Sequence, residues 1–256
     1  MTNAMPSGKT KDGFDALEWK SRCELAAAYR LMAHFKMTDL TSTHLSLRVE
    51  GSNNHYLLNP YGLLFEEVTA SNLVKFDLDG NVLDDTSYIP NPAGYAFHAS
   101  IHKARLDAAA IVHSHSRAGC AFAALDCELE PINQISMIFH GHVAYAGYSF
   151  VSEVEEATSA VEALGDKKVM IMRNHGLLTC GRTIGEAFIL AYYLDKACEI
   201  QLDAMASGRS FALPSKGAVD HAVKGWWDWD KDQPFGVNDW NALLRTLDSR
   251  DSSYRT

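Results

Sequence analysis

Apolar residues recur along the first part of the chain with the spacing of a helix that is buried on one side. From Leu17 to Phe35 they fall three or four residues apart, which predicts an amphipathic helix. Two short apolar-rich stretches follow, residues 45–49 and 55–58, and the residues between them are rich in glycine, serine and asparagine. Because such residues favour tight turns, we expect the two stretches to form a pair of antiparallel strands.

The middle of the chain predicts a second strand pair and a helix. Residues 73–76 and 82–83 are apolar-rich and flank turn-forming residues at 77–80, as the strands of a hairpin do. After this pair, Asn91 can cap a helix that has Pro92 in its first turn and runs to about residue 105.

Capping-box patterns mark two helix starts in the second half. Ser152 stands three residues before Glu155, and Thr183 stands three residues before Glu186. The second of these helices is expected to be long, because its apolar residues keep helical spacing until Gly208.

Strands joined in hairpins between helices, rather than one strand alternating with one helix, favour a mixed, mostly antiparallel sheet between helical layers. We therefore predict an α/β fold with three layers, α/β/α. We expect a flexible N-terminus at residues 1–14, one domain at residues 15–210 and a C-terminal extension at residues 211–256.

The extension is rich in tryptophan, which lines substrate pockets or attaches a terminal helix to another surface. We favour the second interpretation, in which the extension packs on the domain or on a neighbouring subunit. The tryptophans in question are Trp226, Trp227, Trp229 and Trp240.

Composition narrows the class of protein. The chain has 256 residues, of which 47% are hydrophobic, so it can bury a full core. Its five cysteines are odd in number and contain no Cys-x-x-Cys pair, so we expect free thiols and a cytoplasmic protein. No apolar run approaches the roughly 20 residues of a membrane span, and the first residues lack the apolar core of a signal peptide. A net charge of -9 without a cluster of lysine and arginine argues against a nucleic-acid partner.

Three histidines in two short contexts offer candidate chemistry. His113 and His115 follow an apolar run at residues 108–112, and His175 follows one at residues 169–172; both runs are typical of buried strands. Because side chains alternate along a strand, His113 and His115 project from the same face. Three neutral imidazoles with one open position form a recurring catalytic zinc set, and imidazole also suits iron, copper and nickel. Ordinary histidines at strand ends are the alternative interpretation.

Two further histidine pairs have spacings that suit a metal. His98 and His102 lie four residues apart on the predicted helix, but alanine follows His98 where a metalloprotease has its glutamate. We interpret them as a pair on one helix face. His140 and His142 alternate as ligands on a strand would, and a second metal site there is the less favoured alternative.

The blocks around these histidines resemble the class II aldolase/adducin family. The matching blocks occur in the family's order at residues 43–48, 59–64, 98–107, 113–115, 174–181, 186–188 and 192–198. The resemblance implies the same three-layer fold, a divalent metal ion held by His113, His115 and His175, and a carbon–carbon lyase ancestry. Zinc is the expected ion, with manganese, iron, cobalt and nickel as alternatives. The resemblance also implies a cyclic homo-oligomer, most simply a tetramer, with the site at a subunit boundary.

This chain departs from the sugar-phosphate aldolases of that family at the base. In those enzymes a Ser-Ser-Glu segment ahead of the helix histidine supplies a glutamate that acts as base. Counted back from His98, the glutamate position holds Gly94. Another group must then transfer the proton, and we take His98, His140 and Tyr145 as candidates.

The family's phosphate-binding turns are also altered. Its Ser-Gly-Asn turn appears here as residues 42–44, Ser-Thr-His, and its Thr-Pro-x-Gly turn appears as residues 59–62, Asn-Pro-Tyr-Gly. A phosphorylated sugar is therefore disfavoured, and a carboxylate is the expected alternative. The candidate substrate-binding residues are His44, Arg48, Asn59, Gly62 and Gly94.

Two classes of function remain open. One is a metal-dependent carbon–carbon lyase, a decarboxylase or an aldolase, which acts on a small hydroxy, oxo or carboxylated substrate through a metal-stabilised enolate. Decarboxylation ranks slightly first, because loss of carbon dioxide itself delivers the electron pair and only a later proton donor is needed. The other is a noncatalytic scaffold, since residues 91–95 look closer to the adducin branch, whose members associate with the actin and spectrin cytoskeleton.

Overall fold

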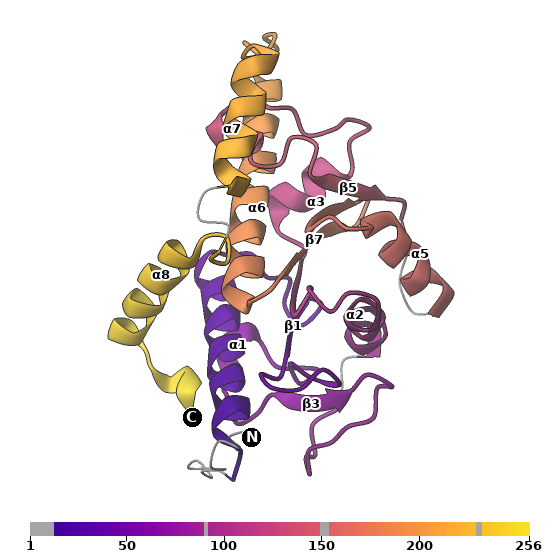
Figure 1. The fold of residues 1–256 in the computed structure, drawn as a ribbon, viewed down its shortest axis with the longest axis vertical. Coiled ribbons are helices and arrows are strands. Elements are labelled where there is room, and N and C mark those ends of the chain that lie inside the picture. Colours follow the sequence, from indigo (N-terminus) through magenta and orange to yellow (C-terminus); the bar gives the residue numbers. More distant parts are fainter. Residues whose placement is uncertain (1–12, 90–91, 149–153, 229–231) are drawn as a thin grey trace.

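The computed structural model describes residues 13–89, 92–148, 154–228 and 232–256, and most of the predicted flexible N-terminus lies outside them. Seven strands form one sheet in the order β3-β2-β1-β4-β7-β6-β5 (Figure 1). All neighbours are antiparallel except β5 and β6, which are parallel. The strands are β1 (His44–Arg48), β2 (His55–Leu58), β3 (Val74–Asp77), β4 (Ala110–Ser114), β5 (Val143–Ala146), β6 (Val169–Met172) and β7 (Gly176–Gly181). The mixed, mostly antiparallel sheet is confirmed.

Helices cover both faces of this sheet, which confirms the three-layer arrangement. Helices α2 and α5 pack together on one face, and α1, α3 and α6 pack on the other (Figure 1). The helices are α1 (Ala16–His34), α2 (Pro92–Ala104), α3 (Arg117–Ala123), α4 (Gln134–Met137), α5 (Val154–Leu164), α6 (Ile184–Ala206), α7 (Lys216–Asp228) and α8 (Val237–Arg250). None of the helices within the described ranges combines the length and the apolar character that a bilayer crossing requires.

The alternation of strand residues decides which side chains face which helices. On β4, Val112 packs in the cluster with α1 and α6, whereas Ile111 packs with Phe97 and Ile101 of α2. His113 is two residues from Ile111 and therefore shares its face, toward α2. Strand β4 therefore has apolar side chains toward α1 and α6. Toward α2 it has Ile111 and then, near its end, His113.

Local signals explain most element boundaries. The Thr183 hydroxyl accepts a hydrogen bond from the amide of Glu186 at 3.1 Å and caps α6 as predicted. The reciprocal bond differs, because the Glu186 carboxylate accepts from the amide of Arg182 at 2.7 Å rather than from the cap residue. Residues 82–83 form a single bridge, Val82 with Phe76, rather than a strand. The cap residues predicted at Asn91 and Ser152 lie outside the described residues.

The C-terminal helices pack back on the body of this chain. Helix α7 contacts α4, and α8 contacts α6 and α1. Trp240 is buried against Phe188 of α6, and the Trp227 indole donates to the carbonyl of Ile138 at 2.8 Å. A contact of the extension with a neighbouring subunit stays a prediction, and Trp229 lies outside the described residues.

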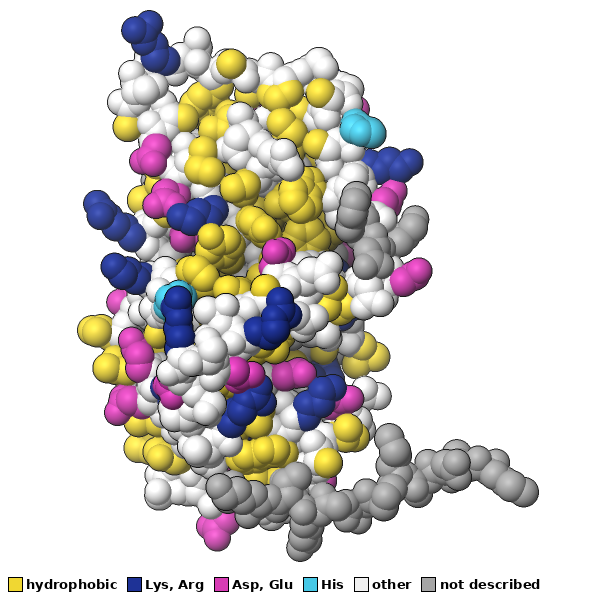
Figure 2. All heavy atoms as spheres, turned by 90° about the vertical axis from the view of Figure 1, so that its left-hand side faces the viewer, with side chains coloured by type: hydrophobic (Ala, Val, Ile, Leu, Met, Phe, Trp, Pro, Cys, Tyr) yellow, Lys and Arg dark blue, Asp and Glu magenta, His cyan; other side chains and the backbone are white. Residues whose placement is uncertain are grey.

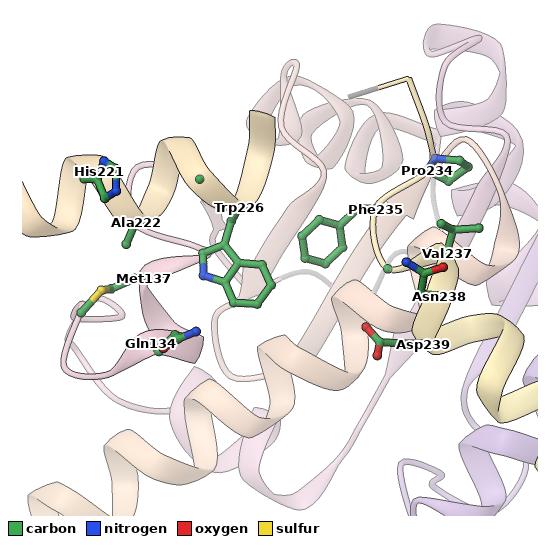
Figure 3. A pocket seen from close by; sticks show the side chains of 12 residues that line it. Gln134, Met137, His221, Ala222, Trp226, Pro234, Phe235, Val237, Asn238 and Asp239 are labelled. Carbon is green, nitrogen blue, oxygen red and sulfur yellow. The ribbon is translucent and has the colours of Figure 1, made fainter. Parts of the chain in front are cut away.

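A cavity of about 630 Å³ lies where this extension meets the body. Trp226 of α7 and Phe235, with ring centroids 6.2 Å apart, form its apolar middle (Figure 3). On the face shown in Figure 2, hydrophobic side chains gather in the middle of the upper half, and the lower half has charged side chains of both signs among polar and hydrophobic ones. None of the three candidate metal ligands lines this cavity.

Candidate metal centre

The structure brings together the three histidines that the sequence singled out. His113 lies in β4, His115 directly follows β4, and His175 directly precedes β7. One nitrogen from each ring lies within 4.8 Å of the others. His113 is buried and the other two are partly exposed, so the group opens toward the surface. No second such group of metal-binding side chains occurs in the part of the chain that the structure describes.

Hydrogen bonds orient two of these rings. His113 Nδ1 lies 3.0 Å from the carbonyl oxygen of Leu177, and His115 Nδ1 lies 3.0 Å from a carboxylate oxygen of Asp39. A carbonyl oxygen only accepts, so His113 donates through Nδ1 and its neutral ring keeps a lone pair on Nε2. Asp39 fixes His115 in the same way. Carboxylates and carbonyls beside metal-binding histidines commonly have this orienting role.

The two Nε2 atoms that result face each other at 3.0 Å. Two lone pairs at that distance repel one another unless a cation or a proton lies between them. Two nitrogens bound to one tetrahedral zinc at about 2.0–2.1 Å are about 3.3 Å apart, which is close to the observed spacing. The arrangement of His113 and His115 therefore fits a divalent metal ion, with His175 as a third ligand.

The turn before β7 explains the sequence Asn-His-Gly at residues 174–176. Asn174 has a φ of +58°, in the left-handed region that asparagine tolerates better than most residues. A Cβ atom on Gly176 would lie 2.5 Å from the carbonyl oxygen of Ser114 and 3.0 Å from the ring of His115. Only glycine lets β7 begin this close to β4, so Gly176 positions His175 beside the other two ligands.

The environment of His113 keeps its ring neutral, as a metal ligand requires. Burial is the main cause that lowers the pKa of His113 well below its ordinary value, and the nearby imidazoles of His44, His115 and His175 lower it further. The hydrogen bond to Leu177 opposes this shift.

A second set of histidines begins next to the triad. His44 pairs with His113 across β1 and β4, and the centroids of their rings are 5.1 Å apart. His98 of α2 contacts His44 rather than the triad, since its Nε2 lies 2.8 Å from His44 Nδ1. His44 is thus the candidate substrate-binding residue that the structure places beside the metal ligands.

Gly94 of α2 lies against the same ring. A Cβ atom on Gly94 would lie 3.1 Å from Cγ and Cδ2 of His44 and 3.3 Å from Cδ2 of Leu58. The imidazole of His44 therefore fills the space into which a side chain at position 94 would extend.

Two candidates for the base, His140 and Tyr145, lie just before and within β5. The hydroxyl of Tyr145 accepts from the amide of Leu129 at 2.8 Å, and its ring packs with the cluster on the α6 side of the sheet. His113 faces α2, so Tyr145 and His113 lie on opposite faces of the sheet in this chain. His140 is exposed in the turn before β5, and its neighbour His142 stacks on Trp227. The orientation of these side chains is not readable from local spacing.

Three candidates for substrate binding also have other contacts. Arg48 lies at the other end of β1 from His44. It donates to the carbonyl of His102 at 2.7 Å and to the carbonyl of Asn53. Asn59 is fully buried, and its side-chain oxygen accepts from the hydroxyl of Tyr29 at 2.8 Å. Gly62 lies in an exposed turn with a φ of +90°. Arg48 and Asn59 therefore stabilise the fold through these hydrogen bonds.

Two residues beside the triad were not singled out by the sequence. Asp39, in the loop between α1 and β1, orients His115 although 76 residues separate them. Tyr148 follows β5 and is 63% exposed, and its ring centroid lies 6.3 Å from that of His175. No periodicity or spacing in the sequence connects either residue with the ligands, because only the folded sheet brings them there.

The chain resembles known proteins over most of its length. Residues 23–202 match the family described as Class II Aldolase and Adducin N-terminal domain. A crystal structure of an aldolase II superfamily protein from Pseudomonas syringae is 42% identical, with a TM-score of 0.89, and the match covers 97% of this chain and 100% of that one.

Two other matches bear on the kind of protein. An L-fuculose 1-phosphate aldolase from Glaciozyma antarctica is 30% identical with a TM-score of 0.81, and the match covers 99% of this chain and 97% of that one. Alpha-adducin of Rattus norvegicus is 38% identical over 97% of this chain, which spans only 35% of that longer protein. The first of these two proteins is named as an enzyme, whereas alpha-adducin is not.

Proposed function

Because the chain belongs to the class II aldolase and adducin family, we propose that it is a divalent-metal-dependent lyase that breaks a carbon–carbon bond in a small hydroxy, oxo or carboxylated substrate. The observation that supports this most directly is the pair of Nε2 atoms on His113 and His115, which face each other at 3.0 Å. Their Nδ1 atoms are held by Leu177 and Asp39. We take zinc as the first choice of ion, with manganese, iron, cobalt and nickel as alternatives.

A divalent ion held by His113, His115 and His175 would act as a Lewis acid toward substrate oxygens beside the bond that breaks. The protein's own part is to hold the three rings in place. Leu177 and Asp39 fix the first two, and the Asn174 turn with Gly176 fixes the third. The partial exposure of His115 and His175 leaves an approach for a small molecule from outside.

The absence of the family's glutamate decides which of the two candidate reactions, decarboxylation or aldol cleavage, we rank first. Position 94 is a glycine whose open side is filled by His44, so no carboxylate enters the site from α2 there. Aldol cleavage needs a group that takes the hydroxyl proton at the outset. In decarboxylation the departing carbon dioxide leaves its electron pair on the substrate carbon, and a proton is added later. We therefore place decarboxylation slightly ahead of aldol cleavage.

The relationship to alpha-adducin favours a second candidate. That relative is 38% identical over nearly all of this chain and does not have an enzyme's name. A noncatalytic binding module with a structural or vestigial metal site would have the same fold. A structural metal is enclosed by protein ligands, whereas a catalytic metal keeps a position for water or substrate.

The experiment combines metal analysis with a screen for products. Purified wild-type protein, His115→Ala and His140→Ala are analysed for metal, and each is then incubated with a panel of hydroxy acids, oxo acids and hydroxyketones. We expect about one divalent ion per chain in the wild type and in His140→Ala, whose ring is exposed outside the triad, and loss of the ion from His115→Ala.

Product is expected from the wild type and not from His115→Ala, and His140→Ala serves as a control for metal content alone. Equal metal content in all three proteins would contradict the site. Bound metal without any carbon dioxide or aldehyde released from the panel would favour the binding module.

We also propose a cyclic homo-oligomer and a cytoplasmic location. The hydrophobic side chains in the upper half of Figure 2 offer a surface that another copy of the chain can cover. The five cysteines are free thiols, as is usual in a reducing compartment.

A further inference from the structure

Four buried polar side chains lead from the interior to the candidate metal centre. We call His102, Ser46, His98 and His44 the histidine chain. His102 Nε2 lies 2.8 Å from Ser46 Oγ, which lies 2.5 Å from His98 Nδ1, and His98 Nε2 lies 2.8 Å from His44 Nδ1. At the inner end, His102 Nδ1 lies 3.1 Å from the carbonyl oxygen of Ala108.

That carbonyl oxygen sets the direction of every bond in the histidine chain. It can only accept, so His102 donates through Nδ1 and has a lone pair on Nε2 when neutral. The hydroxyl of Ser46 must then donate its one proton to His102 and accept from His98 Nδ1. His98 in turn has its lone pair on Nε2, so His44 donates through Nδ1.

The histidine chain has no charged partner to change this order. His98, His102 and Ser46 are completely buried, and His44 is 4% exposed. Among the described residues, Arg48 is the charged side chain that the histidine chain meets, and it donates to the backbone carbonyl of His102. Burial and the positive charge of Arg48 lower the pKa of His102 to about 3, and burial lowers the pKa of His98 as well, so both rings are neutral near pH 7.

The outer end of the histidine chain faces the metal ligands. The ring of His44 lies beside that of His113, and no described residue is hydrogen-bonded to His44 Nε2. In the neutral ring this nitrogen is an acceptor for which the described residues supply no donor. Gly94 is the residue that leaves room for the ring in this position, since a Cβ atom there would press on it at 3.1 Å.

We propose that the histidine chain fixes His44 with its Nε2 as a hydrogen-bond acceptor for a hydroxyl group of the substrate, which makes His44 a specificity-determining residue. The proposal rests on the function proposed above. It separates substrates by chemistry, because a hydroxyl can donate to His44 Nε2 whereas a phosphate dianion offers only acceptor oxygens. His98, Ser46 and His102 are positioning residues that act through His44.

The first test reads the orientation of His44 without metal or substrate. Metal-free protein labelled with ¹⁵N in histidine gives long-range proton–nitrogen spectra that distinguish the two ring tautomers. We expect the Nδ1–H form for His44, His98 and His102 in the wild type. Ser46→Ala removes the link in the middle, so His44 should lose its single form and show a mixture.

Ser114→Ala is the matched control. It makes the same change at another buried serine, whose hydroxyl has no hydrogen-bond partner among the described residues. This variant should keep the wild-type spectrum of His44. An Nε2–H form of His44 in the wild type, or an unchanged spectrum in Ser46→Ala, would overturn the proposal whether or not the protein is a lyase.

The second test measures binding to zinc-loaded protein by calorimetry, with glycolate and acetate as probes. The two share a carboxylate and differ in the hydroxyl. We expect the wild type to prefer glycolate, and the preference to fall about three- to tenfold in His44→Phe and Ser46→Ala, as for one hydrogen bond. Equal preference in wild type and variants would refute the role of His44. A protein that binds glycolate in this way but releases no product from any substrate would contradict only the proposed lyase.

Discussion

Arg22 and His44 both belong to buried polar networks, but the two networks end differently. Arg22 on α1 is fully buried and meets carboxylates on two sides, Glu18 at 2.9 Å and Asp84 at 2.6 Å. It also donates to the carbonyl of Leu73 at 2.7 Å, and Lys75 reaches Glu18 at 2.7 Å. We call these four charged side chains the Arg22 cluster.

The ion pairs of the Arg22 cluster join its own members, and its guanidinium also donates to backbone carbonyls and lies over the ring of Phe14. The histidine chain instead ends on His44 Nε2, for which the described residues supply no donor. In the Arg22 cluster opposite charges are paired with one another, so we expect its effect to be on the stability of the fold. The last atom of the neutral network, His44 Nε2, has no donor among the described residues, so it can accept a hydrogen bond from a ligand. The comparison suggests that an incomplete network, rather than an unusual one, marks the place where a ligand binds.

Removal of Arg22 is the strongest way to test the closed network. Arg22→Ala leaves Glu18 and Asp84 with no guanidinium, so the free energy of unfolding should fall by about 3–5 kcal/mol. Urea unfolding measures this change, and the metal affinity of the folded variant should stay as in the wild type.

Lys20→Ala is the control for loss of an ion pair at the surface. Lys20 and Glu50 form a pair whose side chains are about half exposed, so this variant should lose at most about 1 kcal/mol. A similar small loss in Arg22→Ala would show that the Arg22 cluster is not what holds α1 to β3.

Asp39→Ala tests the candidate metal site without changing any of its three ligands. Asp39 holds His115 Nδ1 at 3.0 Å, so its loss should weaken metal binding about tenfold to a hundredfold while the metal-free protein unfolds as before. Competition with a chelator of known affinity measures the change. Asp79→Ala, which removes an exposed partner of Lys103, should leave the affinity unaltered. Equal affinities in the two variants would mean that Asp39 does not orient the ligand.

Acid should act on the histidine chain through His102. Burial and Arg48 lower its pKa from the ordinary 6.5 to about 3 in the folded protein. Between pH 6.5 and about 3, His102 binds a proton in the unfolded chain but not in the folded protein. The free energy of unfolding therefore does not depend on His102 above pH 6.5, and it falls as the pH drops from 6.5 toward 3. The fall approaches about 1.4 kcal/mol per pH unit for one such group.

Urea unfolding at several pH values measures this slope. His102→Gln should have a smaller slope than the wild type below pH 6, by about one proton, and the same pH dependence above pH 7. Parallel curves throughout would show that His102 is not held neutral by the fold.

Local patterns in the sequence were sufficient for most elements. The apolar spacing at residues 17–35 predicted α1, and the short apolar runs predicted β4 and β6. These features follow from nearest neighbours along the chain, so they do not depend on which strands lie next to one another. The second hairpin is present in part, because Val82 forms one antiparallel bridge with Phe76 on the edge of β3 away from β2, and this pairing is too short to count as a strand.

The candidate site was predictable only in part. The His-x-His spacing and the resemblance pointed to the three ligands, but nothing local connects Ser46 with His98 or Asp39 with His115. Those contacts need the registry of β1 against β4 and the packing of α2 on the sheet. Tyr145 was a candidate on sequence proximity alone, and the face to which its strand turns it could not be known in advance.

The position of β4 in the middle of the sheet has a consequence for how the protein assembles. Its neighbours are β1 and β7, and both pairings join segments far apart in the sequence, His44 with His113 and His113 with Leu178. Such distant pairings are late steps in folding, since long loops must close first. A chain that emerges from the ribosome N-terminus first has His113 and His115 well before His175. The three candidate ligands come together only when these pairings have formed, so a metal ion at this site would bind a sheet that is already assembled.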